Sequence, residues 1–115
     1  LNSEAPRASG TLESHYAPTA KVRLMSTTDW QKALAALVPH VQNLALWSVQ
    51  KPSFELLGAG LVWRAMPSNA TQAAHDLFSV LRDFDSRGVR TIWIETPPPT
   101  PDWEGVRDRL NRAAA

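Results

Sequence analysis

The side chains that could carry out chemistry are scattered, apart from one short segment near the amino end. His15 and Tyr16 stand side by side between Ser9 and Pro18, in a stretch that is otherwise small and polar and has nothing nearby to bury an aromatic ring. A histidine and a tyrosine can be the anchors of a segment that docks on another surface. The alternative is a mobile linker without a role of its own. The residues by themselves leave both interpretations open.

The usual signatures of nucleotide, metal and hydrolase sites are missing from the sequence. The turn after the first expected strand, Met25 to Asp29, has none of the glycines that let a backbone approach a pyrophosphate. The histidines at 15, 40 and 75 are far apart, and Ser14 beside His15 is not a triad. With no cysteine, thiolate catalysis, disulfides and the usual zinc sites are excluded. We therefore expect no metal and no cofactor in this chain.

Charged residues offer one further candidate. Arg107, Arg109 and Arg112 could bind a phosphate, but cations at the end of a helix also complement its dipole, and we favour that interpretation. Carboxylates such as Asp83 and Asp85 fall on the polar faces of expected helices, which indicates solvation more than acid–base catalysis. The formal net charge is +1, so a surface built for nucleic-acid backbones is not indicated, and we expect no direct nucleic-acid binding.

The elements that must position these residues follow an α/β pattern. Apolar residues recur at spacings of three and four over residues 70–84, which predicts an amphipathic helix that packs on a sheet. Ser68 or Asn69 can cap its start, and Gly88 can end it. The β-branched and aromatic run at 90–96 predicts a buried strand directly afterwards. A helix followed at once by a strand is half of an α/β repeat.

Three further strands and two further helices complete the predicted fold. The strands are expected at residues 21–25, 44–49 and 61–66, and the helices from about Trp30 and from Pro101, after a Thr100 cap. Because Gly58–Gly60 reads as a short connection, the third strand is expected to run antiparallel to the second. Trp30, Trp47 and Trp103 fall on apolar stripes and are expected in the core, whereas Trp63 is not settled. The sum is a small three-layer, Rossmann-like α/β sandwich with a mainly parallel sheet.

At 115 residues the chain fits one domain with a tail. We expect an interdomain linker or arm over residues 1–19 and the Rossmann-like domain over residues 20–115. No uncharged apolar run approaches the ~20 residues of a membrane span. The amino end has no signal core, and its start at Leu1 indicates a boundary inside a longer protein. The absence of cysteine fits a reducing compartment, so we expect a cytoplasmic protein.

Several segments together resemble one family. The serine–glycine pair at Ser9, followed by His-Tyr-Ala-Pro and a strand, resembles the interdomain linker of the long, two-domain threonylcarbamoyl-AMP synthases. The motifs that are similar to the rest of that family are Leu77-Phe78 with Leu81-Arg82 and Asp85, Ile92-Trp93-Ile94-Glu95, and Asp108-Arg109-Leu110-Asn111-Arg112-Ala113-Ala114. The likeness covers about Ser9 to Ala114. Two positions depart from the pattern, with Ser9 where proline is common and Ser14 where some members have arginine.

The resemblance implies a role within a larger enzyme. In this family an amino-terminal catalytic domain of the YrdC type precedes the linker and a small Rossmann-like domain. These nucleotidyltransferases condense threonine, bicarbonate and ATP into threonylcarbamoyl-AMP, releasing pyrophosphate, for threonylcarbamoyladenosine formation in tRNA. The resemblance implies that the small domain closes the catalytic pocket against water. ATP and Mg²⁺ are implied for the full-length enzyme only, and this chain alone is expected to be inactive.

The resemblance also implies which residues meet the substrate. Carried over position by position, it assigns contacts with the nucleotide or the threonine-derived intermediate to Ser14, His15, Tyr16, Ala17 and Pro18. His15 and Tyr16 are the expected principal contacts, and no catalytic residue is assigned to this chain. The alternative is a free-standing α/β binding or protein-interaction module whose arm grips a partner.

Overall fold

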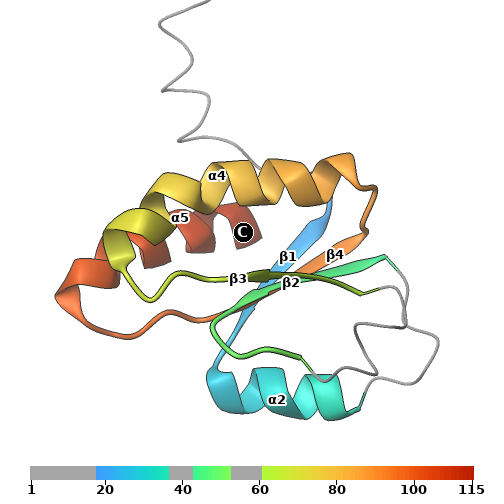
Figure 1. Ribbon diagram of the computed structural model, residues 1–115, viewed down its shortest axis with the longest axis horizontal. Coiled ribbons are helices and arrows are strands. Elements are labelled where there is room, and N and C mark those ends of the chain that lie inside the picture. The colour runs from blue at the N-terminus through green and yellow to red at the C-terminus, as the bar shows by residue number, and fades with distance from the viewer. Residues whose placement is uncertain (1–17, 37–42, 53–60) are drawn as a thin grey trace, which may run out of the picture.

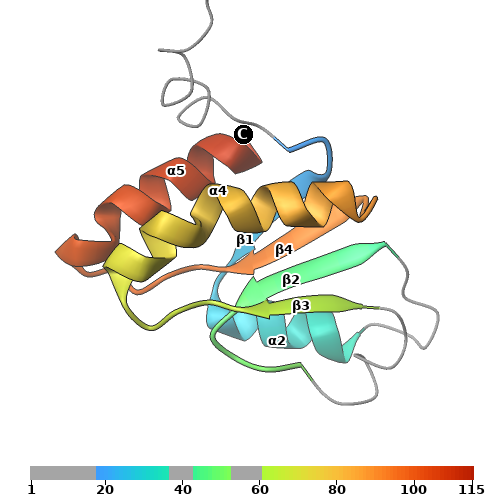
Figure 2. The ribbon, with the colours of Figure 1, turned by 45° about the horizontal axis from the view of Figure 1, so that its top comes forward.

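The computed structural model describes residues 18–36, 43–52 and 61–115, and these form a sheet with helices on both faces (Figure 1). Its four strands are all parallel, in the order β1-β4-β2-β3. The elements are β1 (Lys21–Met25), α2 (Thr27–Ala35), β2 (Leu44–Ser48), β3 (Val62–Ala65), α4 (Ala70–Ser86), β4 (Thr91–Glu95), the 3-10 turn η1 (Pro101–Trp103) and α5 (Glu104–Ala114). Helix α2 covers one face, and α4 and α5 lie side by side on the other (Figure 2). The predicted three-layer α/β fold is confirmed.

The third strand runs parallel to the second, so the antiparallel pairing expected from the sequence is wrong. Ala45 lies opposite Val62, and Ser48 lies opposite Ala65, in parallel register. The sequence reading took only the glycine-rich stretch as the connection. The link between the two strands in fact spans residues 49–61, which reaches the dozen or so residues that a parallel crossover needs. The four carboxyl ends therefore meet at one edge of the sheet.

The larger core lies between the sheet and the α4–α5 layer. Its side chains come from both helices and from the central strands, where β-branched and aromatic residues fit a sheet that is covered on both faces. The largest of those that are almost inaccessible to solvent are Trp47, Leu77, Val80, Leu81, Phe84, Ile92, Ile94, Val106 and Leu110. The stripes predicted for the helix at 70–84 and for the last helix are thus the faces that pack on the sheet.

A smaller core lies beneath α2. Trp30 and Leu34 of α2 are buried against Leu44 and Leu46 of β2, with Trp93 partly buried beside them. The predicted core positions of the three tryptophans are confirmed, because Trp30, Trp47 and Trp103 are 1%, 0% and 4% exposed. The later residues expected on the same helical face, at 37, 38 and 41, lie outside the described residues.

Short polar side chains cap the starts of α2 and α4, the second of them at Asn69 as predicted. Ser26 Oγ accepts a hydrogen bond from Asp29 N–H at 3.1 Å, and Asn69 Oδ1 accepts one from Gln72 N–H at 2.9 Å. Gly88, just past α4, has a φ of +76°, a conformation that glycine adopts without strain. Thr100 is the N-cap residue of η1 and Pro101 follows it, as predicted, but the Thr100 side chain makes no capping hydrogen bond. Within the described ranges, no helix has the length and apolar character to cross a bilayer.

Candidate functional site

The carboxyl edge of the sheet is the first place to look for a site, because α/β folds of this kind bind ligands there. The chain leaves the neighbouring strands β1 and β4 toward opposite faces. After β1 it enters α2 on one side of the sheet, and after β4 it enters η1 and α5 on the other (Figure 1). The position between these two strand ends is therefore the topological switch point, where a nucleotide would bind in a dinucleotide-binding fold.

A carboxylate of the protein itself fills the switch point. Glu95, the last residue of β4, is only 6% exposed. Its Oε2 accepts a hydrogen bond from Thr27 Oγ1 at 2.6 Å, and its Oε1 accepts from Val49 N–H at 2.9 Å and Gln50 N–H at 3.2 Å. Thr27 is the first residue of α2, where the helix dipole favours a negative charge. Glu95 thus occupies donors that an anionic ligand would use.

Ser48 extends this network to the edge strand β3. Its hydroxyl donates to the carbonyl of Gln50 at 2.6 Å and accepts from Trp63 Nε1 at 3.1 Å. Trp63, which the sequence left unsettled, is therefore a half-buried side chain tethered to β2. The carboxyl-edge cluster, as we name it, consists of Thr27, Ser48, Gln50, Trp63 and Glu95. Hydrogen bonds within the cluster connect the end of β4 with the start of α2 and the end of β2, and connect β2 with β3. None of these side chains forms a nucleophile–base pair.

A carboxylate of α4 holds the backbone where the arm meets the domain. Thr19 N–H donates to Asp85 Oδ2 at 3.0 Å, and Ala20 N–H donates to Asp85 Oδ1 at 3.1 Å. Both carboxylate oxygens thus hold consecutive backbone groups just before β1. Pro18, the one predicted site residue that the structure describes, is half-buried immediately before this clamp. The other predicted site residues, Ser14, His15, Tyr16 and Ala17, lie outside the described residues.

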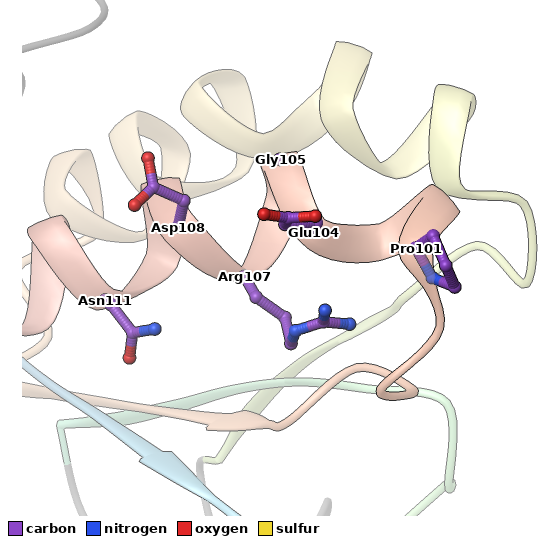
Figure 3. Close-up of a pocket in the computed structure, with 6 residues that line it drawn as sticks. All are labelled: Pro101, Glu104, Gly105, Arg107, Asp108 and Asn111. Atoms are coloured by element: carbon purple, nitrogen blue, oxygen red, sulfur yellow. The ribbon is translucent and has the colours of Figure 1, made fainter.

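Hollows among the described residues include two on the α4–α5 side of the molecule. The first has a volume of about 450 Å³ and runs between the two helices, and we name it the α4–α5 groove. It is lined by Thr71, Ala74, His75, Phe78, Ser79, Arg82 and Arg109. The second, of about 730 Å³, follows the outer face of α5 and is lined by Pro101, Glu104, Gly105, Arg107, Asp108 and Asn111 (Figure 3). Neither hollow includes a residue of the carboxyl-edge cluster.

The three arginines of α5 lie in different surroundings. Arg107 extends from the helix in Figure 3, and it donates to the carbonyl oxygens of Pro98 and Thr100, the latter at 3.1 Å, so it holds the connection between β4 and η1. Arg112 pairs with Asp108 at 3.0 Å. Arg109 instead lines the α4–α5 groove. The three side chains do not converge on one phosphate site, and Arg112 alone fits the favoured interpretation of an exposed helix end.

The motifs behind the family resemblance contain residues that hold the domain together. Glu95 ends the strand motif and joins the strand ends, Asp85 ends the helix motif and clamps the arm, and Leu110 is fully buried. Sequence reasoning missed the first two roles, since it assigned Asp85 to solvation and left Glu95 without partners. For Glu95 the sequence did hold a signal, because an acid at the end of an otherwise apolar strand needs hydrogen-bond partners when it is buried.

A search for metal ligands adds no further site in the described part of the chain. No group of three or more histidine or acidic side chains there could hold a metal ion. His75 lies in the α4–α5 groove, whereas His15 and His40 fall outside the described residues.

Comparison with known proteins identifies the family. The family model described as threonylcarbamoyl-AMP synthase, C-terminal domain, matches residues 2–115, nearly the whole chain. Comparisons with curated proteins and with solved structures gave no match. Domains of this family normally accompany a catalytic domain of the YrdC type. The matched range includes the arm, the Asp85 clamp and the carboxyl-edge cluster, and the chain therefore belongs to the family of threonylcarbamoyl-AMP synthase C-terminal domains.

Proposed function

We propose that this chain is the accessory domain that closes the catalytic pocket of a threonylcarbamoyl-AMP synthase. The reaction joins threonine, bicarbonate and ATP into threonylcarbamoyl-AMP and pyrophosphate, for the modification of tRNA in the cytoplasm. The observation that carries the proposal is the family match over residues 2–115, which takes in the arm as well as the domain. The filled switch point supports it, because Glu95 already uses the donors that a nucleotide bound to this domain would need.

The chemistry explains why a closing domain is useful. A threonylcarbamoyl adenylate is labile to water, so excluding solvent from the pocket protects the product until it is passed on. In this proposal ATP and Mg²⁺ bind to the catalytic domain, and Ser14 to Pro18 cross the mouth of its pocket. His15 supplies a ring nitrogen for hydrogen bonding, and Tyr16 supplies a face for stacking. The Asp85 clamp gives this segment a fixed starting point on the domain.

Calorimetric titration of ATP tests the proposal directly. ATP is expected to bind the intact two-domain enzyme and not this chain alone. Tyr16→Ala in the intact enzyme is expected to weaken binding about 5- to 150-fold, because stacking of a base on an aromatic ring is worth about 1–3 kcal/mol. Tyr16→Phe keeps the ring and is the matched control, expected to bind nearly as well as the unmodified enzyme.

Two results would contradict the proposal. One is formation of threonylcarbamoyl-AMP by the isolated chain, which would place a complete site within it. The other is an ATP affinity of the intact enzyme that Tyr16→Ala leaves unchanged. If that variant instead lost binding to another protein, the free-standing interaction module would be the better description.

A further inference from the structure

We propose that the α4–α5 groove is the docking site of the chain's own arm, residues 9–17, with Asp85 setting the point at which the arm enters. The groove is thus occupied by a segment of this chain, whose acidic and aromatic side chains bind to a surface lined by arginines. The proposal concerns this chain by itself, with no catalytic domain present to compete for Ser14 to Pro18, and it does not depend on the proposed role in synthesis.

The first argument is where the described chain begins. Thr19 and Ala20 are held by Asp85, which lies on α4 one turn beyond Arg82. Phe78, Arg82 and Asp85 are spaced by four and three residues, so they lie on one face of the helix. Because Phe78 and Arg82 line the groove, the clamp holds the root of the arm at one end of it.

The second argument is reach. Ser14 precedes Pro18 by four residues, and an extended chain of that length spans about 13 Å at ~3.3 Å per residue. Ser79 precedes Asp85 by six residues, which is about 9 Å along a helix at ~1.5 Å per residue. The arm from Ser14 onward is therefore long enough to cover the groove from its Asp85 end to Ser79.

The third argument is complementary charge. The groove contains the cations Arg82 and Arg109 together with His75, around the half-buried ring of Phe78. The residues that line the groove include two arginines and no carboxylate, so the lining is basic. Asp108, which lies one residue before Arg109, pairs with Arg112 at 3.0 Å.

The arm supplies the matching groups. Between Ser9 and Ala17 the sequence holds one acid, Glu13, and no lysine or arginine. The Glu13 carboxylate can accept paired hydrogen bonds from an arginine guanidinium group, and the Tyr16 ring can pack against the ring of Phe78. The groove therefore matches the arm in two ways: its arginines can bind the Glu13 carboxylate, and Phe78 can contact the Tyr16 ring. The arm is also attached at one end of the groove, through Asp85.

A disulfide test can measure the docking, because the chain contains no cysteine and an introduced pair is unique. The test variant carries Ser14→Cys and Ser79→Cys, and its control carries Ser14→Cys and Ser86→Cys. Ser79 and Ser86 are both exposed serines of α4, and Ser86 lies next to the clamp but outside the groove. Each variant is oxidised at low protein concentration, and intramolecular disulfide is followed by mass spectrometry. Far-UV circular dichroism checks that both variants are folded.

The expected result is a disulfide that forms several-fold faster with the cysteine at 79 than with the one at 86, although 86 is nearer the root of the arm. Adding Arg109→Glu to both variants is expected to slow the bond at 79 in the test variant and to leave the bond at 86 in the control unchanged. Equal rates at the two positions, or a rate at 79 that Arg109→Glu does not alter, would overturn the proposal. So would disulfides formed only between two molecules, which would assign the groove to a second copy.

Discussion

Replacement of Trp47 by alanine is expected to lower the free energy of unfolding by about 3–5 kcal/mol, the usual cost of truncating a large core side chain. Trp47 is completely buried on β2, in the core beneath α4 and α5. Removing the indole would leave a cavity between the sheet and two helices, and this layer cannot collapse into it without losing its other contacts. The loss would be a large fraction of the stability of a domain of this size.

Trp47→Phe is the informative control, because it separates ring volume from the indole N–H. In the described part of the chain, the Nε1 of Trp47 finds no hydrogen-bond acceptor, and an unpaired buried donor costs about 1–3 kcal/mol. Phenylalanine removes that donor and keeps most of the ring, so its net cost should stay below about 1.5 kcal/mol. Urea unfolding followed by far-UV circular dichroism measures both variants. Equal losses for alanine and phenylalanine would contradict this account.

Glu95→Ala is expected to destabilise the domain by about 2–4 kcal/mol. Each of its three hydrogen bonds involves an ionised acceptor, and such bonds contribute about 1.5–3 kcal/mol apiece. The total is expected to be below their sum, because Val49 and Gln50 are exposed residues whose N–H groups can regain water in the variant. The remaining loss of stability comes from removing the hydrogen bonds through which Glu95 holds the ends of β1, β2 and β4 together.

Glu95→Gln is the matched variant for these hydrogen bonds. The amide oxygen can still accept from the N–H groups of Val49 and Gln50, and the amide nitrogen can donate to Thr27 Oγ1, so the cost should be about 1 kcal/mol or less. Amide hydrogen exchange gives a local readout, with faster exchange expected at residues 49 and 50 in Glu95→Ala. An alanine variant that is as stable and as protected as the glutamine variant would show that the carboxyl-edge cluster does not join the strands.

Local patterns in the sequence were sufficient for most of the architecture. The apolar period over 70–84, closed by Asn69 and Gly88, predicted α4 within a residue or two, because caps and a 3.6-residue stripe are properties of the helix itself. The strand at 21–25 was predicted with its observed bounds. The tryptophan positions followed from the same stripes, since a ring on an apolar face is usually buried.

The errors and omissions concern contacts between distant parts of the chain. The direction of β3 depended on the length of the whole link between β2 and β3, residues 49–61, of which the glycine-rich stretch is only a part. The partners of Glu95 lie 68, 46 and 45 residues away in sequence, and no spacing rule connects them. Asp85 looked like a solvated carboxylate because its partners, Thr19 and Ala20, offer only backbone N–H groups. The predicted contacts of Ser14 to Pro18 with substrate stay predictions.

The strand order has a consequence for how this domain folds. Thr91–Glu95, the last strand in the sequence, pairs with Lys21–Met25 on one side and with Leu44–Trp47 on the other. Until that strand has been synthesised, the first strand has no neighbour and the sheet is split in two. Contacts of such long sequence separation slow folding. A nascent chain should therefore stay open to proteases until nearly all of it has left the ribosome, and then fold in one late step.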